Sequence, residues 1–174
     1  MKNDKERIKD RIDEITDEIF AVADWLKDNP ETAYQEYKAC EHLSRLLSKR
    51  GFDVEKGPGG VETAFLGRPS GAQPGRPTVA VLTEYDALPG IGHGCGHNII
   101  AAASIGAAIA LKDTLADAAG NIAIIGTPAE EGGGGKVKLA EAGVFDQMDM
   151  ALMFHPSDSN LPGKDNLGRI KFKM

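Results

Sequence analysis

The sequence predicts an α/β fold: a three-layer α/β/α arrangement with a mostly parallel central sheet. Three short apolar runs carry this prediction, and helical patterns lie between them: 78–83, 121–127 and 149–154. Runs that stay apolar along their length indicate strands covered on both faces of a sheet. The order strand–helix–strand–helix–strand favours parallel pairing with right-handed crossovers.

Four helices are expected around these strands. Apolar residues recur at helical spacing from Glu6 to Lys27, and Asn29-Pro30 ends that pattern. A second helix should run from about Glu36 to Lys49, with Gly51 as a natural cap. Two more helical patterns lie between the later strands, at about 98–114 and 135–142.

Weaker strand signals lie at 52–55 and 61–66, before a loop rich in Gly and Pro at 67–77. A loop of this length and composition indicates a surface connection and not a domain boundary. The 174 residues therefore fit one domain, which is long enough to bury a core without disulfides.

Composition and charge exclude several classes of protein. The net charge of -6 and the lack of a basic stripe argue against a nucleic-acid binder. No apolar run reaches the roughly 20 residues that a membrane span needs, and the charged N-terminus precedes no apolar signal core. The only two cysteines, Cys40 and Cys95, lie in unlike contexts. We therefore expect a cytoplasmic protein without a disulfide and without a nucleic-acid or membrane partner.

The stretch from Glu84 to His97 concentrates groups that bind metals. It holds two carboxylates, two imidazoles and a thiol, and its alternate glycines allow tight turns that bring side chains together. Cys95 and His97 can point into one pocket as a thiolate–imidazole pair, and His93 is a weaker candidate on the loop. Taken alone, this Cys-Gly-His is also compatible with a structural or reactive cysteine.

Polar residues follow each of the three apolar strands. Glu84 and Asp86 follow the first, Glu130 and Glu131 the second, and His155 the third. Ligands of parallel sheets bind beyond the carboxyl ends of the strands, so these groups are expected at one rim. An acidic loop and a hydrogen-bonded rim histidine are the ordinary alternatives for each group by itself.

The two adjacent glutamates should have different roles, because neighbouring side chains in extended or turn backbone point apart. One can bind a metal while the other acts as general base on a water molecule. The glycine run that follows fails the phosphate-loop pattern, since Val137 stands after Lys136 where Ser or Thr is required. Asp86 is best interpreted as a carboxylate that orients a ligand.

The chain resembles the metal-dependent aminoacylase/carboxypeptidase (zinc peptidase) family in four motifs that occur in order. They are Thr-Glu-Tyr-Asp-Ala-Leu-Pro, His-Gly-Cys-Gly-His-Asn, Thr-Pro-Ala-Glu-Glu-Gly and Phe-His-Pro. The likeness is greatest to the amidohydrolase branch that contains indole-acetyl-amino-acid hydrolases and aminobenzoyl-glutamate utilisation proteins. Asn98, where many members have Asp, favours the aminobenzoyl-glutamate side.

The resemblance implies a site for two divalent metal ions, zinc or manganese, roughly 3.5–4 Å apart. It implies Cys95, His97, Glu131 and His155 as metal ligands and Glu130 as the catalytic general base. The implied reaction is hydrolysis of the amide bond in an N-acyl amino acid, an aminobenzoyl-glutamate-like compound or a small dipeptide.

The surrounding residues are assigned supporting roles. Asp86 is expected to orient a ligand, and Glu84 and His93 are expected nearby, outside the direct ligand set.

The family pattern continues beyond this sequence. Its catalytic domain resumes after a lid domain and supplies a last histidine ligand there, whereas no histidine follows His155 here. The sequence therefore predicts the N-terminal half of a catalytic domain at 1–163 and the start of a truncated lid or dimerisation domain at 164–174. An apolar surface should lie exposed where the missing part would dock, and it would favour a homo-oligomer.

Two other functions remain open at this stage. The chain could be a non-enzymatic fragment that keeps the fold but binds metal weakly, with only one of the two ions held, or that acts only by association with another chain. It could also be a cysteine hydrolase that uses Cys95 with a histidine base.

Overall fold

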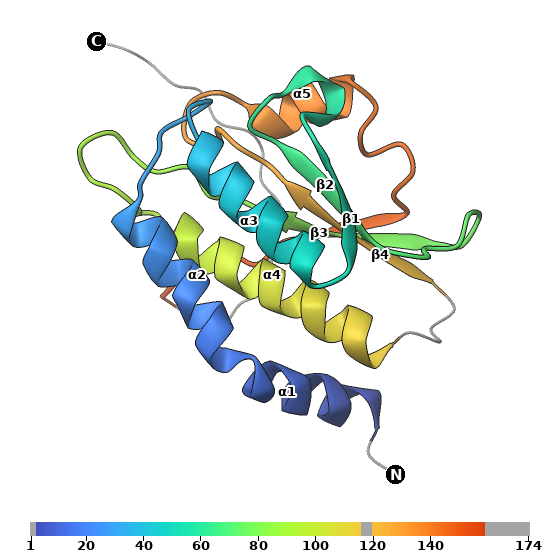
Figure 1. Cartoon of the computed structure of the whole chain (residues 1–174). Helices are drawn as coiled ribbons and strands as arrows, with labels where there is room; N and C mark the ends of the chain where they lie inside the picture. Colours follow the sequence, from blue (N-terminus) through green and yellow to red (C-terminus); the bar gives the residue numbers. More distant parts are fainter. Residues whose placement is uncertain (1–2, 116–119, 159–174) are drawn as a thin grey trace.

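The computed structural model describes residues 3–115 and 120–158, and its strands form one five-stranded sheet in the order β1-β2-β4-β3-β5 (Figure 1). The strands are β1 (Phe52–Lys56), β2 (Phe65–Pro69), β3 (Thr78–Thr83), β4 (Asn121–Gly126) and β5 (Met150–Leu152). The pairings β3–β4 and β3–β5 are parallel, and β2 pairs antiparallel with both β1 and β4. The sheet is mixed, with β2 alone running against the others, and the α/β class is confirmed.

Helices cover the sheet, and a short 3-10 turn, η1 (Pro58–Gly60), precedes β2. They are α1 (Asp4–Glu14), α2 (Thr16–Asp28), α3 (Tyr37–Lys49), α4 (His97–Thr114) and α5 (Gly135–Glu141). The single helix expected over Glu6–Lys27 is wrong in one respect, because it breaks at Ile15 into α1 and α2. The hydroxyl of Thr16 donates to the carbonyl of Ile12, a side-chain bond that bends helices. The apolar stripe runs through the break, so periodicity gave no sign of it.

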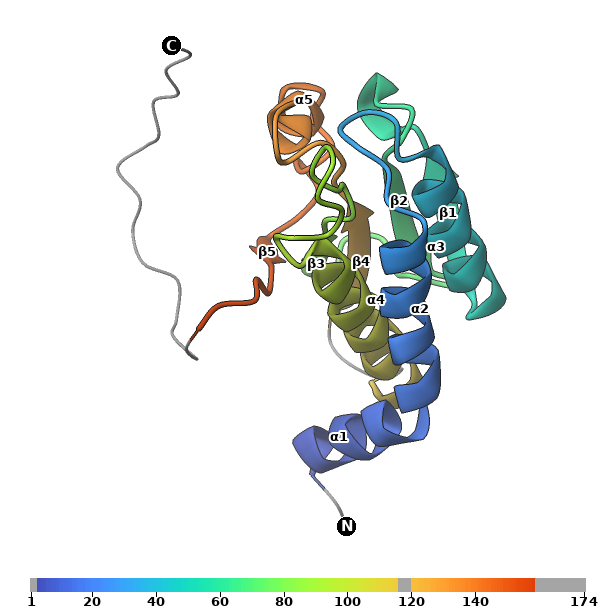
Figure 2. The same cartoon turned by 90° about the vertical axis from the view of Figure 1, so that its left-hand side faces the viewer.

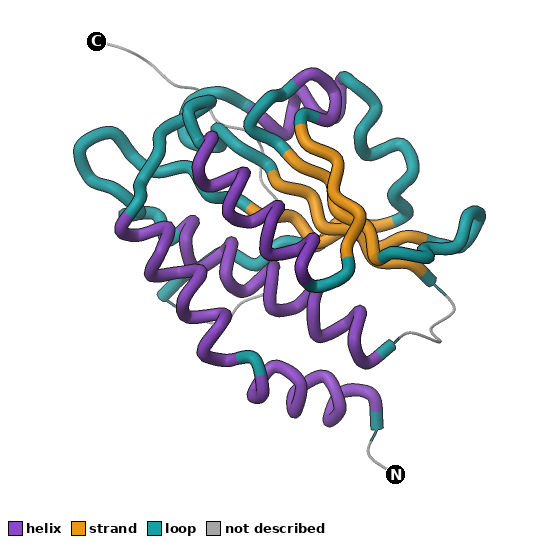
Figure 3. The backbone as a smooth tube through the Cα atoms, viewed as in Figure 1, coloured by secondary structure: helices purple, strands orange, loops and turns teal. Residues whose placement is uncertain are grey.

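Two apolar cores lie on opposite faces of the sheet, which gives the three layers that Figures 2 and 3 show. Neighbouring residues of β4 divide between them, as alternation along a strand requires. Ile124 packs with α2, α3 and α4, whereas Ala123 and Ile125 pack with Leu139 of α5. The larger core belongs to the face that carries α4.

The helices that follow β3 and β4 lie on opposite faces of the sheet. Helix α4 connects β3 to β4 across one face, and α5 then connects β4 to β5 across the other, with β5 on the far side of β3. In α/β sheets, a crevice opens beyond the carboxyl ends of two strands whose connections leave on opposite faces. Here those two strands are β3 and β4, so this rule places the expected site beyond their carboxyl ends.

The short edge strand β5 exposes apolar side chains. Met150, Leu152, Met153 and Phe154 each have between 43% and 55% of their surface exposed. This apolar surface agrees with the expectation from the sequence, whereas the homo-oligomer stays a prediction. The boundary expected at 164–174 lies outside the described residues.

Among the described residues, no helix combines the length and the apolar character that crossing a membrane requires.

Candidate metal centre

His97 is the buried centre of the candidate site. It is the first residue of α4, and Gly96 precedes it with a φ of 79°, a left-handed conformation that glycine adopts without strain. Its Nδ1 lies 2.9 Å from both the backbone oxygen and the Oδ1 of Asp86. With its proton on Nδ1 donated to Asp86, the imidazole turns the lone pair of Nε2 toward the carboxylates of Glu84 and Glu131.

Charge around His97 favours a cation. Burial lowers the pKa of His97, but the hydrogen bond that His97 donates to Asp86 and the charges of Asp86 and Glu84 outweigh it and raise that pKa. The site therefore attracts positive charge at Nε2.

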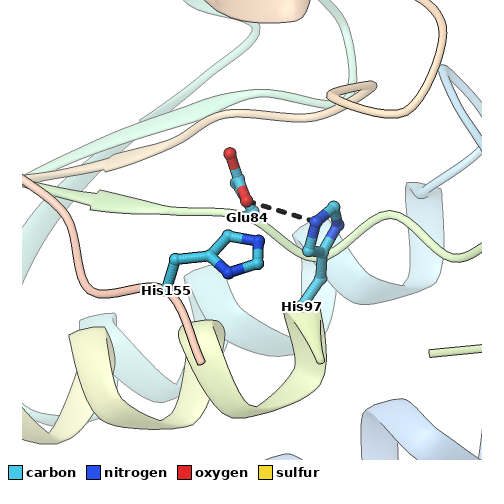
Figure 4. A group of neighbouring side chains, drawn as sticks. All are labelled: Glu84, His97 and His155. Atoms are coloured by element: carbon cyan, nitrogen blue, oxygen red, sulfur yellow. Dashed lines mark ion pairs between the residues drawn. The ribbon is translucent and has the colours of Figure 1, made fainter. Parts of the chain in front are cut away.

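Glu84, directly after β3, and His155, in the segment after β5, approach His97, as Figure 4 shows. The Oε2 of Glu84 lies 3.3 Å from Nε2 of His97, and both side chains are buried. The ring of His155 stands edge-on to that of His97, with centroids 6.1 Å apart. One ligand atom from each of these three residues lies within 4.8 Å of the other two.

A second group brings in the loop after β4. Ligand atoms of His97, Glu130 and Glu131 also lie within 4.8 Å of one another. Glu131 places its Oε1 3.9 Å from Nε2 of His97, and the thiol of Cys95 donates a hydrogen bond to the Glu131 carboxylate. That bond is the main reason why the pKa of Cys95 rises to about 11. Cys95 is thus next to Glu131, and Glu130 is exposed at the mouth of the site.

Asp86 joins the two halves of the site. One carboxylate oxygen faces Nδ1 of His97, and the other accepts a hydrogen bond from the backbone N–H of Glu131 at 2.9 Å. Burial raises the pKa of Asp86, but these hydrogen bonds outweigh it and keep that pKa below its ordinary value. Asp86 therefore remains a carboxylate at neutral pH and orients both His97 and Glu131.

The buried donor atoms fit a divalent cation. Within the described part of the chain, Nε2 of His97 and Oε2 of Glu84 are buried and have no hydrogen-bond partner. Unsatisfied buried polar atoms are costly, and a cation between these two would satisfy both. Nitrogen, carboxylate and thiol donors together suit zinc, and the nitrogen and carboxylate donors also suit manganese.

The residues expected from the sequence fall into three sets. The ligand candidates and the expected base gather around His97, with Cys95 reaching the group through Glu131. Glu84 lies closer to the centre than expected. Its Oε2 is near enough to Nε2 of His97 for both atoms to bind the same metal ion. His93 belongs to neither ligand group found among the described residues, and burial lowers its pKa.

Sequence reasoning missed Lys136. Its ammonium forms an ion pair with Oε1 of Glu84, so a cation already faces one side of the site. The only signal was its position in the first turn of α5, directly after the glycine run.

Known proteins resemble this chain in both sequence and fold. It is 39% identical over 172 residues to the Xaa-Arg dipeptidase of Mus musculus, which covers 90% of this chain and 39% of that protein. It is 37% identical over 168 residues to a p-aminobenzoyl-glutamate hydrolase subunit of Escherichia coli (strain K12), covering 86% and 34%. The chain thus spans between a third and two fifths of the length of these relatives.

The fold matches a dinuclear metal binding peptidase of the M20 family from Bacillus subtilis. The TM-score is 0.70 at 26% sequence identity, and the match covers 77% of this chain and 41% of that one. Residues 72–172 match the sequence profile of peptidase family M20/M25/M40. This stretch includes Glu84, Cys95, His97, Glu130, Glu131 and His155. The chain therefore belongs to peptidase family M20/M25/M40.

Proposed function

We propose that this chain carries metal ligands and the general base of a metal-dependent amidohydrolase. Its substrate class would be N-acyl amino acids, aminobenzoyl-glutamate-like compounds or small dipeptides. The observation that carries the proposal is the buried Nε2 of His97, which has no hydrogen-bond partner in the described chain and faces the carboxylates of Glu84 and Glu131. The names of the relatives support the class of substrate, because they include a dipeptidase and an aminobenzoyl-glutamate hydrolase.

Four side chains would hold the metal ions: Cys95, His97, Glu131 and His155. A fifth, Glu84, lies within reach of the same positions. Bound divalent metal would polarise the substrate carbonyl and lower the pKa of a water molecule. Asp86 fixes the tautomer of His97, so that Nε2 keeps its lone pair for this task.

Glu130 would act on the water. It is exposed and near His97, so its carboxylate can take a proton from the water that attacks the amide carbon. It would then return that proton to the amine nitrogen as the C–N bond breaks. The products are an amine and a carboxylic acid, which loses its proton to the amine or to water, and Glu130 ends in its starting state.

The surroundings of Cys95 argue against the cysteine-hydrolase alternative. A nucleophilic cysteine needs a lowered pKa and a base beside it. The partner of Cys95 is a carboxylate, which raises the pKa of the thiol to about 11.

Metal binding tests the proposal directly. Calorimetric titration of the purified chain with Zn²⁺ and Mn²⁺ should reveal near-stoichiometric binding, which His97→Ala abolishes. His42→Ala is the matched control, because His42 stacks on Trp25 with ring centroids 4.0 Å apart and belongs to neither ligand group. A chain without stoichiometric binding would refute the proposal.

A second assay separates the amidohydrolase from an inactive fragment that acts by associating with another chain. The exposed apolar residues of β5 favour that second candidate. The test is hydrolysis of acyl-amino acids, dipeptides and aminobenzoyl-glutamate, with and without added metal. Turnover by this chain alone would exclude the second candidate, and metal binding without turnover would favour it.

A further inference from the structure

Glu36 is a fully buried carboxylate that the proposed chemistry does not use. It directly precedes α3, and none of its surface is exposed. Glutamate is seldom buried to this extent unless it has a partner. Its Oε1 accepts a hydrogen bond from the backbone N–H of Ala129, at 2.9 Å and 93 residues away in the sequence. Burial raises the pKa of Glu36, so the carboxylate is kept here at a cost.

Ala129 occupies a backbone conformation that alanine avoids. Its φ of 58° lies in the left-handed region, where the Cβ of an L-residue crowds the backbone. Hydrogen bonds hold both sides of the residue, because its carbonyl also accepts from the N–H of Gly133 at 3.0 Å. The next residues are Glu130 and Glu131, so this turn sets the direction in which both carboxylates leave β4.

The segment around Glu36 contacts both loops of the candidate site. The hydroxyl of Tyr34 donates to the carbonyl of Gly133 at 2.5 Å. The carbonyl of Glu31 accepts from the N–H of Ala87, the residue after Asp86, at 2.8 Å. Residues 31–36, here called the clasp, therefore tie the loop after β3 to the loop after β4.

We propose that Glu36 is a positioning residue, whose carboxylate oxygen holds the left-handed turn at Ala129 and thereby directs Glu130 and Glu131 toward His97. Glu36 acts through the backbone of Ala129 and touches neither metal nor substrate. Its consequence for metal binding rests on the proposed function, whereas its hold on the loop does not.

Two conservative variants separate reach from charge. Glu36→Gln keeps an oxygen at the same distance and removes the charge, whereas Glu36→Asp keeps the charge and draws the oxygen back by one methylene. A positioning role requires the oxygen to reach the N–H of Ala129, and it does not require the charge. Hydrogen exchange of residues 127–136 in the metal-free chain should therefore quicken on the order of tenfold in Glu36→Asp and stay unchanged in Glu36→Gln.

The controls distinguish a local hold from general loss of stability. Exchange in α1 should stay as in the wild type, and Glu41→Asp, at a partly exposed position of α3, should change neither segment. Equal acceleration in α1 and in residues 127–136, or no acceleration in Glu36→Asp, would overturn the proposal. If Glu36→Asp does not fold, Glu36→Gln alone decides: tenfold faster exchange in this variant overturns the proposal, and unchanged exchange supports it.

Ala129→Gly provides a rescue that a merely structural role would not produce. Glycine adopts positive φ without strain, so the turn no longer needs the carboxylate to hold it. The double variant Glu36→Asp/Ala129→Gly should recover slow exchange in residues 127–136. Exchange as fast as in Glu36→Asp alone would contradict the proposed link through Ala129.

Cobalt binding then tests the link to the metal centre. With Co²⁺ as the probe, Glu36→Asp should weaken binding about tenfold, and Glu36→Gln should bind as the wild type does. Unchanged Co²⁺ affinity in Glu36→Asp would refute the influence of Glu36 on the site. A wild-type chain that does not bind Co²⁺ would refute the proposed function instead, and hydrogen exchange would still decide the role of Glu36.

Discussion

The two halves of the candidate metal centre differ in how they are held. Glu84, Asp86 and His97 come from the end of β3 and the start of α4, and at most 1% of the surface of each is exposed. Glu130 and His155 come from the ends of β4 and β5 and are exposed. The buried half is oriented by its own hydrogen bonds, whereas the direction of Glu130 depends on backbone contacts from a distant segment. Burial thus fixes the proposed ligand His97, and it leaves the proposed base Glu130 on the exposed side of the site.

The largest expected effect is on catalysis, in the exposed half. Glu130→Gln should lower kcat by about 10²–10⁴, because the amide cannot take the proton from water. Metal content should stay unchanged, since the substitution leaves the proposed ligands in place. Steady-state kinetics together with metal analysis of the same preparation measures both. A variant with full activity would remove Glu130 from the role of base.

Substituting the two histidines allows a direct comparison, because His97 lies in the buried half and His155 in the exposed half. His97→Ala should weaken Zn²⁺ binding by more than about 100-fold, because it removes a buried, preoriented ligand. His155→Ala should have a smaller effect, since this ring is exposed, and its contacts within the described chain are a hydrogen bond to the neighbouring Pro156 carbonyl and edge contact with His97. Competition with a chelator of known affinity measures both constants. An equal loss in the two variants would contradict the division into a fixed and a less fixed half.

Asp86→Asn should cost about 10–100-fold in metal affinity. The neutral amide of asparagine accepts the Nδ1–H of His97 less strongly than a carboxylate does. Its NH₂ group also replaces one of the two oxygens, so that either Glu131 or His97 loses its hydrogen-bond acceptor. Asp53→Asn is the control, because Asp53 lies on β1 and bonds only to Ser70 among the contacts seen in the described chain. Affinity equal to that of the wild type would show that Asp86 does not orient the ligands.

The smallest expected effect is at Lys136. Its ammonium pairs with Oε1 of Glu84 and competes with a metal ion for the same carboxylate. Lys136→Met should tighten Zn²⁺ binding about two- to fivefold, the range for a partly exposed ion pair. Lys138→Met is the matched control, because that ammonium lies over the ring of Tyr34, 4.0 Å from its centroid. Weaker binding in Lys136→Met would mean that the lysine aligns Glu84 instead of competing for it.

Local patterns predicted much of the fold. The apolar runs that became β3, β4 and β5 and the helix over 37–49 are visible in the sequence, because burial on a given face imposes a regular spacing of apolar residues. Other features lacked such a signal. The break at Ile15 lies inside an unbroken apolar stripe, and strand β2 begins at Phe65, within the run expected at 61–66.

The chemistry of the site was likewise divided between sequence and structure. The sequence by itself determined which groups stand at the strand ends: carboxylates after β3 and β4, a thiol and an imidazole before α4, and His155 after β5. Each of these is a local property, since a residue follows its strand whatever the rest of the chain does. Only the tertiary structure decided which atoms meet. Glu84 lies beside His97 and Lys136, and Glu36 holds Ala129 across 93 residues, because packing, and not spacing along the chain, brings those atoms together.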